Sequence, residues 1–210
     1  MAGIAIRALP GVTRAAAEPH RSAFRMMLGY YLINDALYTL TFFVASVFQK
    51  RYGLDLEGVL WLALMFHVVA APSTYILGHW GDRWDMRRVI YVQLVILCAA
   101  LVLLAFGTGD YAPIAIVVLL GLVFGSIQAI CRSLLAALTP GDRAAELFGF
   151  NAVAGRLSAA LGPLTFGAVT AATGNEQAAV LSLILFLVAG GVAISGVRIP
   201  ALRLGAGGAR

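Results

Sequence analysis

The fold is decided by two apolar runs joined by five small or polar residues. Residues 89–106 read VIYVQLVILCAALVLLAF, residues 107–111 read GTGDY, and residues 112–138 read APIAIVVLLGLVFGSIQAICRSLLAAL. A bilayer-spanning helix needs about 20 mostly apolar residues, and each run supplies about that length. The stretch therefore predicts a helical hairpin that crosses a membrane twice.

Four further apolar runs occupy most of the remaining chain. The 210 residues are 61% hydrophobic and 12% charged, whereas soluble domains average nearer one half and one quarter. Six spans use roughly 120 residues, and the connectors between the runs are too short for a domain outside the bilayer. We expect an all-α integral membrane protein with six transmembrane helices, whose other four runs are residues 24–48, 56–77, 147–172 and 178–197.

Lysines and arginines are concentrated on alternate connectors. Arginines occur in both tails and in the connectors at residues 78–88 and 139–146, whereas the opposite side carries only Lys50 and Arg51. Cytoplasmic loops of membrane proteins carry an excess of these residues. We therefore expect a protein integral to the cell (inner) membrane with both termini cytoplasmic.

The rest of the chain forms two tails. We expect a basic cytoplasmic tail at residues 1–23, a six-helix transmembrane domain at 24–198 and a cytoplasmic tail at 199–210. Met1 and the basic tail are typical of a natural start, and a fragment of a longer chain is the alternative. The net charge of +5 is explained by membrane orientation, so we expect no nucleic-acid partner.

An Asn-Asp pair, Asn34 and Asp35, lies about halfway along the first run. A carboxylate at that depth costs about 2.5–3.5 kcal/mol on insertion scales, so it should face a cavity or a partner. Residues three and four positions apart share a helix face, which places Tyr31, Tyr38 and Phe42 beside the pair. We interpret this stripe as the lining of a cavity, and the alternative is a structural hydrogen-bond network between helices.

Two arginines lie inside later runs: Arg132, which follows Gln128 by one turn, and Arg156. A buried arginine needs a carboxylate, a carbonyl cluster or an anionic ligand. Arg132 is near enough to the predicted interface to extend to water, so a surface role and a cavity role both stay open. Arg156 lies deeper and could pair with Asp35 or Asp82, and the sequence does not decide between them.

Small residues mark two candidate helix contacts. Gly121 and Gly125 form a small-xxx-small pair, which lets helix backbones approach closely. Gly162 and Pro163 lie inside the fifth run, where such a pair is typical of either a kink or close packing.

Familiar catalytic patterns are absent from the sequence. It has no His-Glu-x-x-His motif, no Gly-x-Ser-x-Gly motif and no phosphate-binding glycine loop. Cys98 and Cys131 lie in apolar runs without metal-ligand spacing. We therefore expect no enzyme activity, no metal site and no cofactor.

The connector at residues 78–88 reads GHWGDRWDMRR. It resembles the Gly-x-x-x-Asp-Arg-x-Gly-Arg-Arg/Lys gating loop between the second and third helices of each half in major facilitator superfamily transporters. Asp85 and Met86 replace the later Gly and Arg of that pattern, and we expect Asp85 to adopt the left-handed turn that glycine would supply. The matching residues are Gly78, Asp82, Arg83 and Arg87.

Other stretches narrow this resemblance to the carboxyl-terminal six-helix half of vacuolar amino-acid-effluxer-like permeases. The resemblance covers residues 24–198 and implies one major facilitator superfamily half, built as a three-plus-three inverted repeat. In this family the solute site lies between two halves near the bilayer midplane. The stretches that carry the resemblance are YYLIND at residues 30–35, Arg132, Pro140, Arg143, ELFG at residues 146–149, and residues 162–164.

A single half leaves its cavity wall without a facing surface, so the resemblance implies a second half. We expect a parallel homodimer or a heterodimer with another six-helix half. The implied function is a half-size secondary transporter that moves a small polar solute, with amino acids as the indicated class, by alternating access within the membrane lipid. The alternative is a non-transporting membrane subunit that stabilises or regulates a partner transporter. The candidate solute-binding or coupling residues are Tyr31, Asn34, Asp35, Tyr38, Gln128, Arg132 and Arg156.

Overall fold

The computed structural model describes the backbone of residues 10–83, 85–139 and 144–197. In those ranges, nothing is described of the side chains of residues 10–21, 78, 80–83, 144–148, 150–151 and 154–159.

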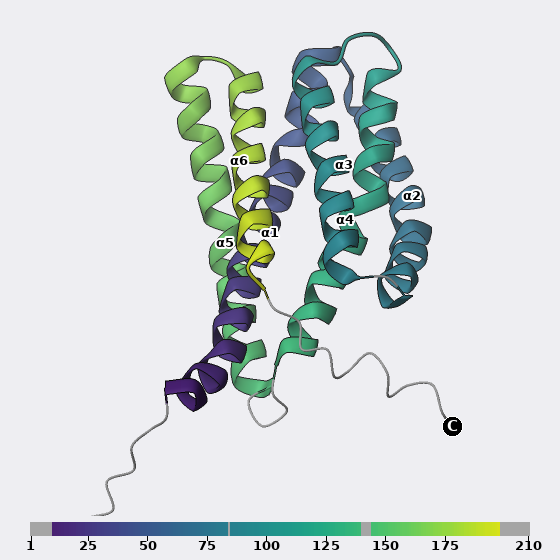
Figure 1. The fold of residues 1–210 in the computed structure, drawn as a ribbon. Helices are drawn as coiled ribbons and strands as arrows, with labels where there is room; N and C mark the ends of the chain where they lie inside the picture. The colour runs from purple at the N-terminus through teal and green to yellow at the C-terminus, as the bar shows by residue number, and fades with distance from the viewer. Residues whose placement is uncertain (1–9, 84, 140–143, 198–210) are drawn as a thin grey trace, which may run out of the picture.

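Six α-helices make up the described part of the chain (Figure 1), which confirms the predicted all-α class. Five contain described segments that are long and apolar enough to cross a membrane. The other helix, α5, has 30 residues, which rise about 45 Å and exceed the thickness of a bilayer core. The helices are α1 (Pro10–Tyr52), α2 (Leu56–Arg83), α3 (Met86–Phe106), α4 (Ala112–Leu138), α5 (Ala144–Thr173) and α6 (Glu176–Ser195).

The first helix begins earlier than its apolar run. α1 starts at Pro10 and not near residue 24, so part of the expected tail is helical. Proline is accepted at the first position of a helix because its missing N–H is not needed there, and the alanines that follow favour helix. Apolarity marks only the membrane-embedded length of a helix, so it gives no sign of a polar extension.

Three short turns close one end of the bundle, where α1, α3 and α5 end. Each contains a glycine with positive φ: Gly53 at 64°, Gly109 at 88° and Gly174 at 63°. Glycine adopts this conformation without a Cβ clash, which allows such short connections. This end is called the glycine-turn end below.

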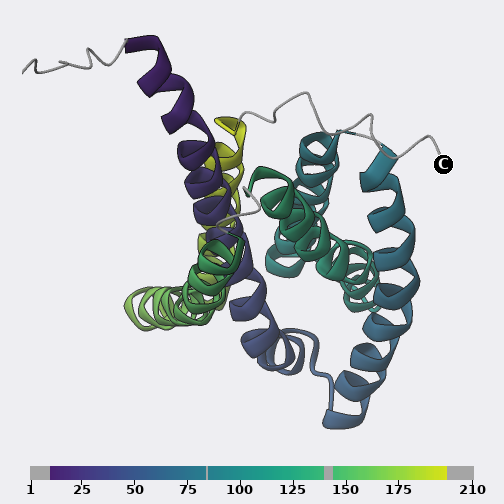
Figure 2. The same ribbon diagram turned by 90° about the horizontal axis from the view of Figure 1, so that it is seen from below.

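The helices pack as two groups of three (Figures 1 and 2). One group contains α1, α5 and α6, and the other contains α2, α3 and α4. The groups meet where α3 packs on α6 and where α1 packs on α4. Each group therefore combines helices from both halves of the chain.

This packing has the symmetry of an inverted repeat. When α1 is matched with α4, α2 with α5 and α3 with α6, one group becomes the other. The two main contacts between the groups, α1 with α4 and α3 with α6, are then each matched with themselves. The matched helices α2 and α5 also share an internal proline, Pro72 and Pro163. The arrangement confirms the predicted three-plus-three repeat.

Glycines on α4 let α2 approach closely. A Cβ at Gly121 would lie 3.0 Å from Val69 of α2, and one at Gly125 would collide with Oγ1 of Thr74. Across the same contact, the hydroxyl of Ser73 donates a 2.9 Å hydrogen bond to the backbone oxygen of Gly121. The predicted contact surface at Gly121 and Gly125 is therefore confirmed.

α2 is the least covered of the five candidate spans. Only 17% of its most apolar segment is buried, against 50% for α1, α3 and α4. The side chains of Leu60, Leu64 and Val68 remain more than half exposed. Contiguous apolar exposure of this kind fits a surface that is covered by lipid or by another membrane helix.

Candidate functional site

Asp35 lies in α1, and its side chain is fully buried. Helix α5 covers it, since a Cβ at Gly162 would lie 3.0 Å from Oδ2 of Asp35. Among the described residues, Asp35 forms no ion pair, and the backbone N–H of Gly162 is the polar group that interacts with its carboxylate. Burying an ionised carboxylate is costly unless it is paired. The carboxyl group therefore requires a proton, a cation or a counter-charge.

Two contacts hold α5 against α1 around Asp35. Oγ1 of the fully buried Thr39 donates a 2.7 Å hydrogen bond to the backbone oxygen of Asp35, and it faces Gly162, where a Cβ has no room. One turn farther along α1, the rings of Phe43 and Phe166 stack with centroids 4.1 Å apart. Of the two interpretations of Gly162, the structure therefore supports close packing.

Tyr31 and Asn34 accompany Asp35 on α1. Asn34 is buried, and its Oδ1 has no hydrogen-bond partner in the described part of the chain. Tyr31 is half-buried and lies within electrostatic reach of the Asp35 carboxylate. The three residues form a polar group in the apolar length of α1.

Arg132 lies on α4, close to Tyr30 of α1. Its side chain is exposed, and its Nε donates a 3.2 Å hydrogen bond to the backbone oxygen of Gln128, which is itself half-buried. Tyr30 lies within electrostatic reach of both Arg132 and Tyr38. A cation therefore marks the α1–α4 contact, whereas Asp35 faces α5.

The stripe predicted on α1 spans two environments. Asn34 and Asp35 are buried, whereas Tyr38 is 39% and Phe42 is 69% exposed. Helical spacing predicts which residues share a face, but the neighbouring helices decide how far each level of that face is covered. The stripe therefore comprises a buried polar part and an exposed aromatic part.

Several predicted site residues have side chains outside the described part. Arg156 belongs to α5, and its pairing with Asp35 or Asp82 stays a prediction. Gly78, Asp82 and Arg83 lie near the end of α2, and their gating role also stays a prediction.

Arg87, the fourth matching residue of the loop, contacts the end of α6. Its Nη1 donates a 2.7 Å hydrogen bond to the backbone oxygen of Val197. The left-handed turn expected of Asp85 is wrong, because its φ of −62° and ψ of 110° are extended. Asp85 is the N-cap of α3, and its Oδ1 accepts a 3.0 Å hydrogen bond from the backbone N–H of Arg87. An N-cap requires extended backbone, and aspartate is among the preferred residues there.

Two polar contacts between helices were not predicted. Arg25 Nη1 donates a 2.9 Å hydrogen bond to the backbone oxygen of Gly196, so that α1 and α3 both satisfy carbonyls at the end of α6. Between α3 and α4, Nε2 of the buried Gln93 donates a 2.9 Å hydrogen bond to Oγ of Ser126. The only signal in the sequence was a polar residue at the edge of, or inside, an apolar run.

Six helices in an inverted three-plus-three packing, with a carboxyl group buried in an apolar helix, define one half of a major facilitator transporter fold. Residues 11–201 match the family described as Vacuole effluxer Atg22 like, and the chain belongs to this family. The membership confirms the resemblance found in the sequence, and this family of transporters is typically not enzymatic.

The curated relatives are longer than this chain. YxiO of Bacillus subtilis (strain 168), an uncharacterized MFS-type transporter, is 31% identical over 182 residues, which cover 86% of this chain and 42% of YxiO. Autophagy-related protein 22 of Kluyveromyces lactis is 23% identical over 173 residues, covering 77% of this chain and 35% of that protein. The uncharacterized membrane protein YJR124C of Saccharomyces cerevisiae is 27% identical over 152 residues, covering 70% and 32%. The chain thus spans less than half the length of these relatives.

Proposed function

We propose that the chain is a half-size secondary transporter, which moves a small polar solute by alternating access together with a second six-helix half. The observation that carries the proposal is Asp35, a buried carboxyl group in a membrane-spanning helix with no charged partner among the described residues. Placing the carboxyl group there costs about 2.5–3.5 kcal/mol. A helix bundle that only supports another protein has no use for this group that would offset the cost. Membership of a transporter family supports the same class.

The charges on α1 and α4 favour a zwitterionic solute. Asp35 offers a carboxylate that lacks a charged partner in the described part, and Arg132 offers an exposed guanidinium. An amino acid carries an ammonium and a carboxylate group, which complement these two charges, so amino acids are the proposed class. The residues proposed to contact the solute or a coupling ion are Tyr31, Asn34, Asp35, Tyr38, Gln128, Arg132 and Arg156, and the proposed gating loop contains Gly78, Asp82, Arg83 and Arg87.

A second half is proposed to cover the exposed surfaces of α2 and of the α1–α4 contact. The exposure of Arg132 and Tyr38, and the greater length of the relatives, support this pairing. The partner is a second copy of this chain or another six-helix chain, arranged in parallel as halves of this fold are. Measurement of the native mass in mild detergent should find twice the chain mass or a complex with a second membrane protein. A stable monomer that transports in liposomes would contradict the pairing.

The positive-inside rule supports an orientation with both termini in the cytoplasm of the cell (inner) membrane. The proposed division is a cytoplasmic tail at residues 1–23, the transporter domain at 24–198 and a second cytoplasmic tail at 199–210.

The deciding experiment compares Asp35→Asn with Gln93→Leu in proteoliposomes. A panel of amino acids is offered with and without an imposed proton gradient. We expect Asp35→Asn to abolish gradient-driven accumulation and to retain downhill exchange, because the amide mimics a permanently neutral carboxyl group. Gln93→Leu changes a buried polar residue between α3 and α4 and should retain both activities.

Two outcomes would contradict the proposal in different ways. If the Asp35→Asn variant still accumulates solute in response to the proton gradient, as the wild type does, Asp35 is not the coupling residue. A correctly assembled protein that moves no member of the panel in either direction would favour the non-transporting subunit.

A further inference from the structure

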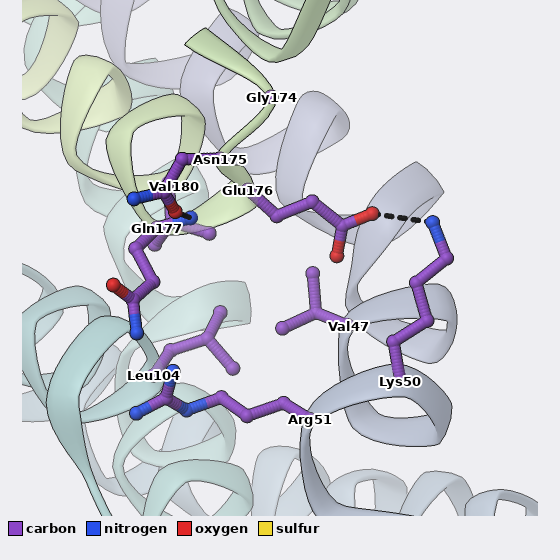
Figure 3. Close-up of a pocket in the computed structure, with 9 residues that line it drawn as sticks. All are labelled: Val47, Lys50, Arg51, Leu104, Gly174, Asn175, Glu176, Gln177 and Val180. Carbon is purple, nitrogen blue, oxygen red and sulfur yellow. Dashed lines mark hydrogen bonds and ion pairs between the residues drawn. The ribbon is translucent and has the colours of Figure 1, made fainter.

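A cavity of about 400 Å³ lies at the glycine-turn end, where α1 ends and α6 begins (Figure 3). Its apolar part is formed by Val47 of α1, Leu104 of α3 and Val180 of α6. Its polar part is formed by the last turn of α1 and the first turn of α6, with Lys50, Arg51, Glu176 and Gln177. In Figure 3, Arg51 extends from α1 toward Leu104 and Gln177.

The polar part of this cavity carries more positive charge than it neutralises. Nζ of Lys50 pairs with Oε1 of Glu176 at 2.5 Å. Nη2 of Arg51 donates a 3.1 Å hydrogen bond to the backbone oxygen of Gly107, but its buried Nε has no acceptor among the described residues. The two cations Lys50 and Arg51 therefore face one carboxylate, that of Glu176. In addition, the buried Nε–H group of Arg51 has no hydrogen-bond acceptor among the described residues, and leaving such a group unpaired destabilises the fold. An anionic group with several acceptor oxygens would satisfy both.

The polar and apolar parts lie at different depths along the helices. Lys50 and Arg51 lie in the last turn of α1, and Val47 lies one turn nearer the middle of that membrane span. Likewise, Val180 lies one turn inside α6 from Glu176. Since cationic side chains near helix ends lie at the bilayer interface, the cavity places its cations at the level of the lipid headgroups. Its apolar lining belongs to the packed core, because Val47, Leu104 and Val180 are only 4%, 1% and 1% exposed.

We propose that this cavity binds the headgroup of an anionic phospholipid, with the phosphate between Lys50 and Arg51 and the acyl chains in the surrounding bilayer. Inorganic phosphate shares the charge but has no acyl chains to hold it in the bilayer. The site is separate from Asp35, which lies 15 residues before Lys50 along α1, or about 22 Å in a helix. Loss of this site therefore leaves the proposed transport site unchanged, and the two proposals can fail independently.

The test is native mass spectrometry of the full chain, purified in mild detergent, with phosphatidylglycerol added. Phosphatidylcholine is the zwitterionic comparison, and millimolar inorganic phosphate is the competitor. We expect bound phosphatidylglycerol that phosphatidylcholine does not replace and that phosphate does not displace. Lys50→Gln and Arg51→Gln should each weaken binding about fivefold, as expected for the loss of one basic residue at a membrane surface. The matched control is Arg88→Gln, because the side chain of Arg88 is 84% exposed at the other end of the bundle.

Glu176→Gln separates lipid binding from structural support. It removes the ion pair with Lys50 and raises the charge of the cavity, so we expect phosphatidylglycerol to bind more tightly. A merely structural role for these residues predicts weaker binding in this variant, and that result would overturn the proposal. Equal retention of the two lipids would also overturn it. Displacement by inorganic phosphate alone would assign the site to a soluble anion and exclude the lipid.

Discussion

Gly162→Ala tests the contact that buries Asp35. The added Cβ would collide with Oγ1 of Thr39 and would lie 3.0 Å from both the backbone oxygen and Oδ2 of Asp35. Backbone atoms cannot move aside cheaply, so α5 has to shift away from α1. Overpacking of this kind costs about 1–3 kcal/mol. For a chain of this size we expect the melting temperature to fall by about 2–12 °C, at roughly 2–4 °C per kcal/mol.

Gly167→Ala is the matched control, because it makes the same change in the same helix. Gly167 is exposed, and a Cβ there meets nothing within 4 Å. Since alanine favours helix over glycine by about 1 kcal/mol, the melting temperature of this variant should be unchanged or slightly higher. Unfolding can be followed with a thiol-reactive fluorophore, because Cys131 is buried in the folded chain.

A second substitution identifies the atom responsible. Thr39→Ala removes the hydroxyl that the new Cβ meets, so the double variant should be more stable than the sum of the two single effects predicts. The recovery should be partial, because the backbone oxygen of Asp35 remains 3.0 Å from the new Cβ. If Gly162→Ala and Gly167→Ala melt at the same temperature, α5 does not pack on α1 as described, and the burial of Asp35 loses its basis.

Three other predictions concern packing and topology. Gly125→Val should lower the melting temperature more than any substitution considered above, because the larger side chain collides with α2 where α2 and α4 pack most closely; an unchanged melting temperature would contradict that packing. Arg87→Gln should destabilise the folded chain by about 1–3 kcal/mol through loss of its hydrogen bond to the end of α6, whereas the exposed Arg88→Gln should have little effect; equal effects would mean that the hydrogen bond contributes nothing. With native cysteines removed, a cysteine at Thr108 should react with an impermeant reagent from outside the cell and one at Asp142 should not; the reverse would invert the proposed orientation.

Apolar runs predicted the helices well, because insertion into a bilayer requires about 20 apolar residues whatever the helix later packs against. The early start of α1 at Pro10 escaped this reasoning, since a helix outside the bilayer needs no apolar residues. Asp85 shows a second limit. An aspartate can act as an N-cap or take a left-handed turn, and only the backbone around it distinguishes the two.

The sequence predicted how deep in the membrane the candidate site lies, but it did not predict which side chains contact one another there. The position of Asp35 within an apolar run showed that its side chain must be shielded from lipid. That Gly162 and Thr39 provide the cover depends on the way α5 crosses α1, which helical periodicity along one chain segment does not encode. The same holds for Tyr38, whose spacing matches that of Asp35 while its exposure does not.

Helix α1 packs with helices of the second half of the chain, and α4 packs with helices of the first half. This arrangement affects the order in which the protein can fold. α1 packs on α5 and α6, α2 packs on α4, and α2 has few contacts with either α1 or α3. The first three helices therefore lack their main packing partners until the residues of α4 to α6 have been synthesised. At about 5–20 residues per second, these later helices take roughly 4–17 s to emerge. During that interval Asp35 is in the membrane without α5 to cover it, so the newly made helices have to stay beside the insertion machinery until the last span arrives.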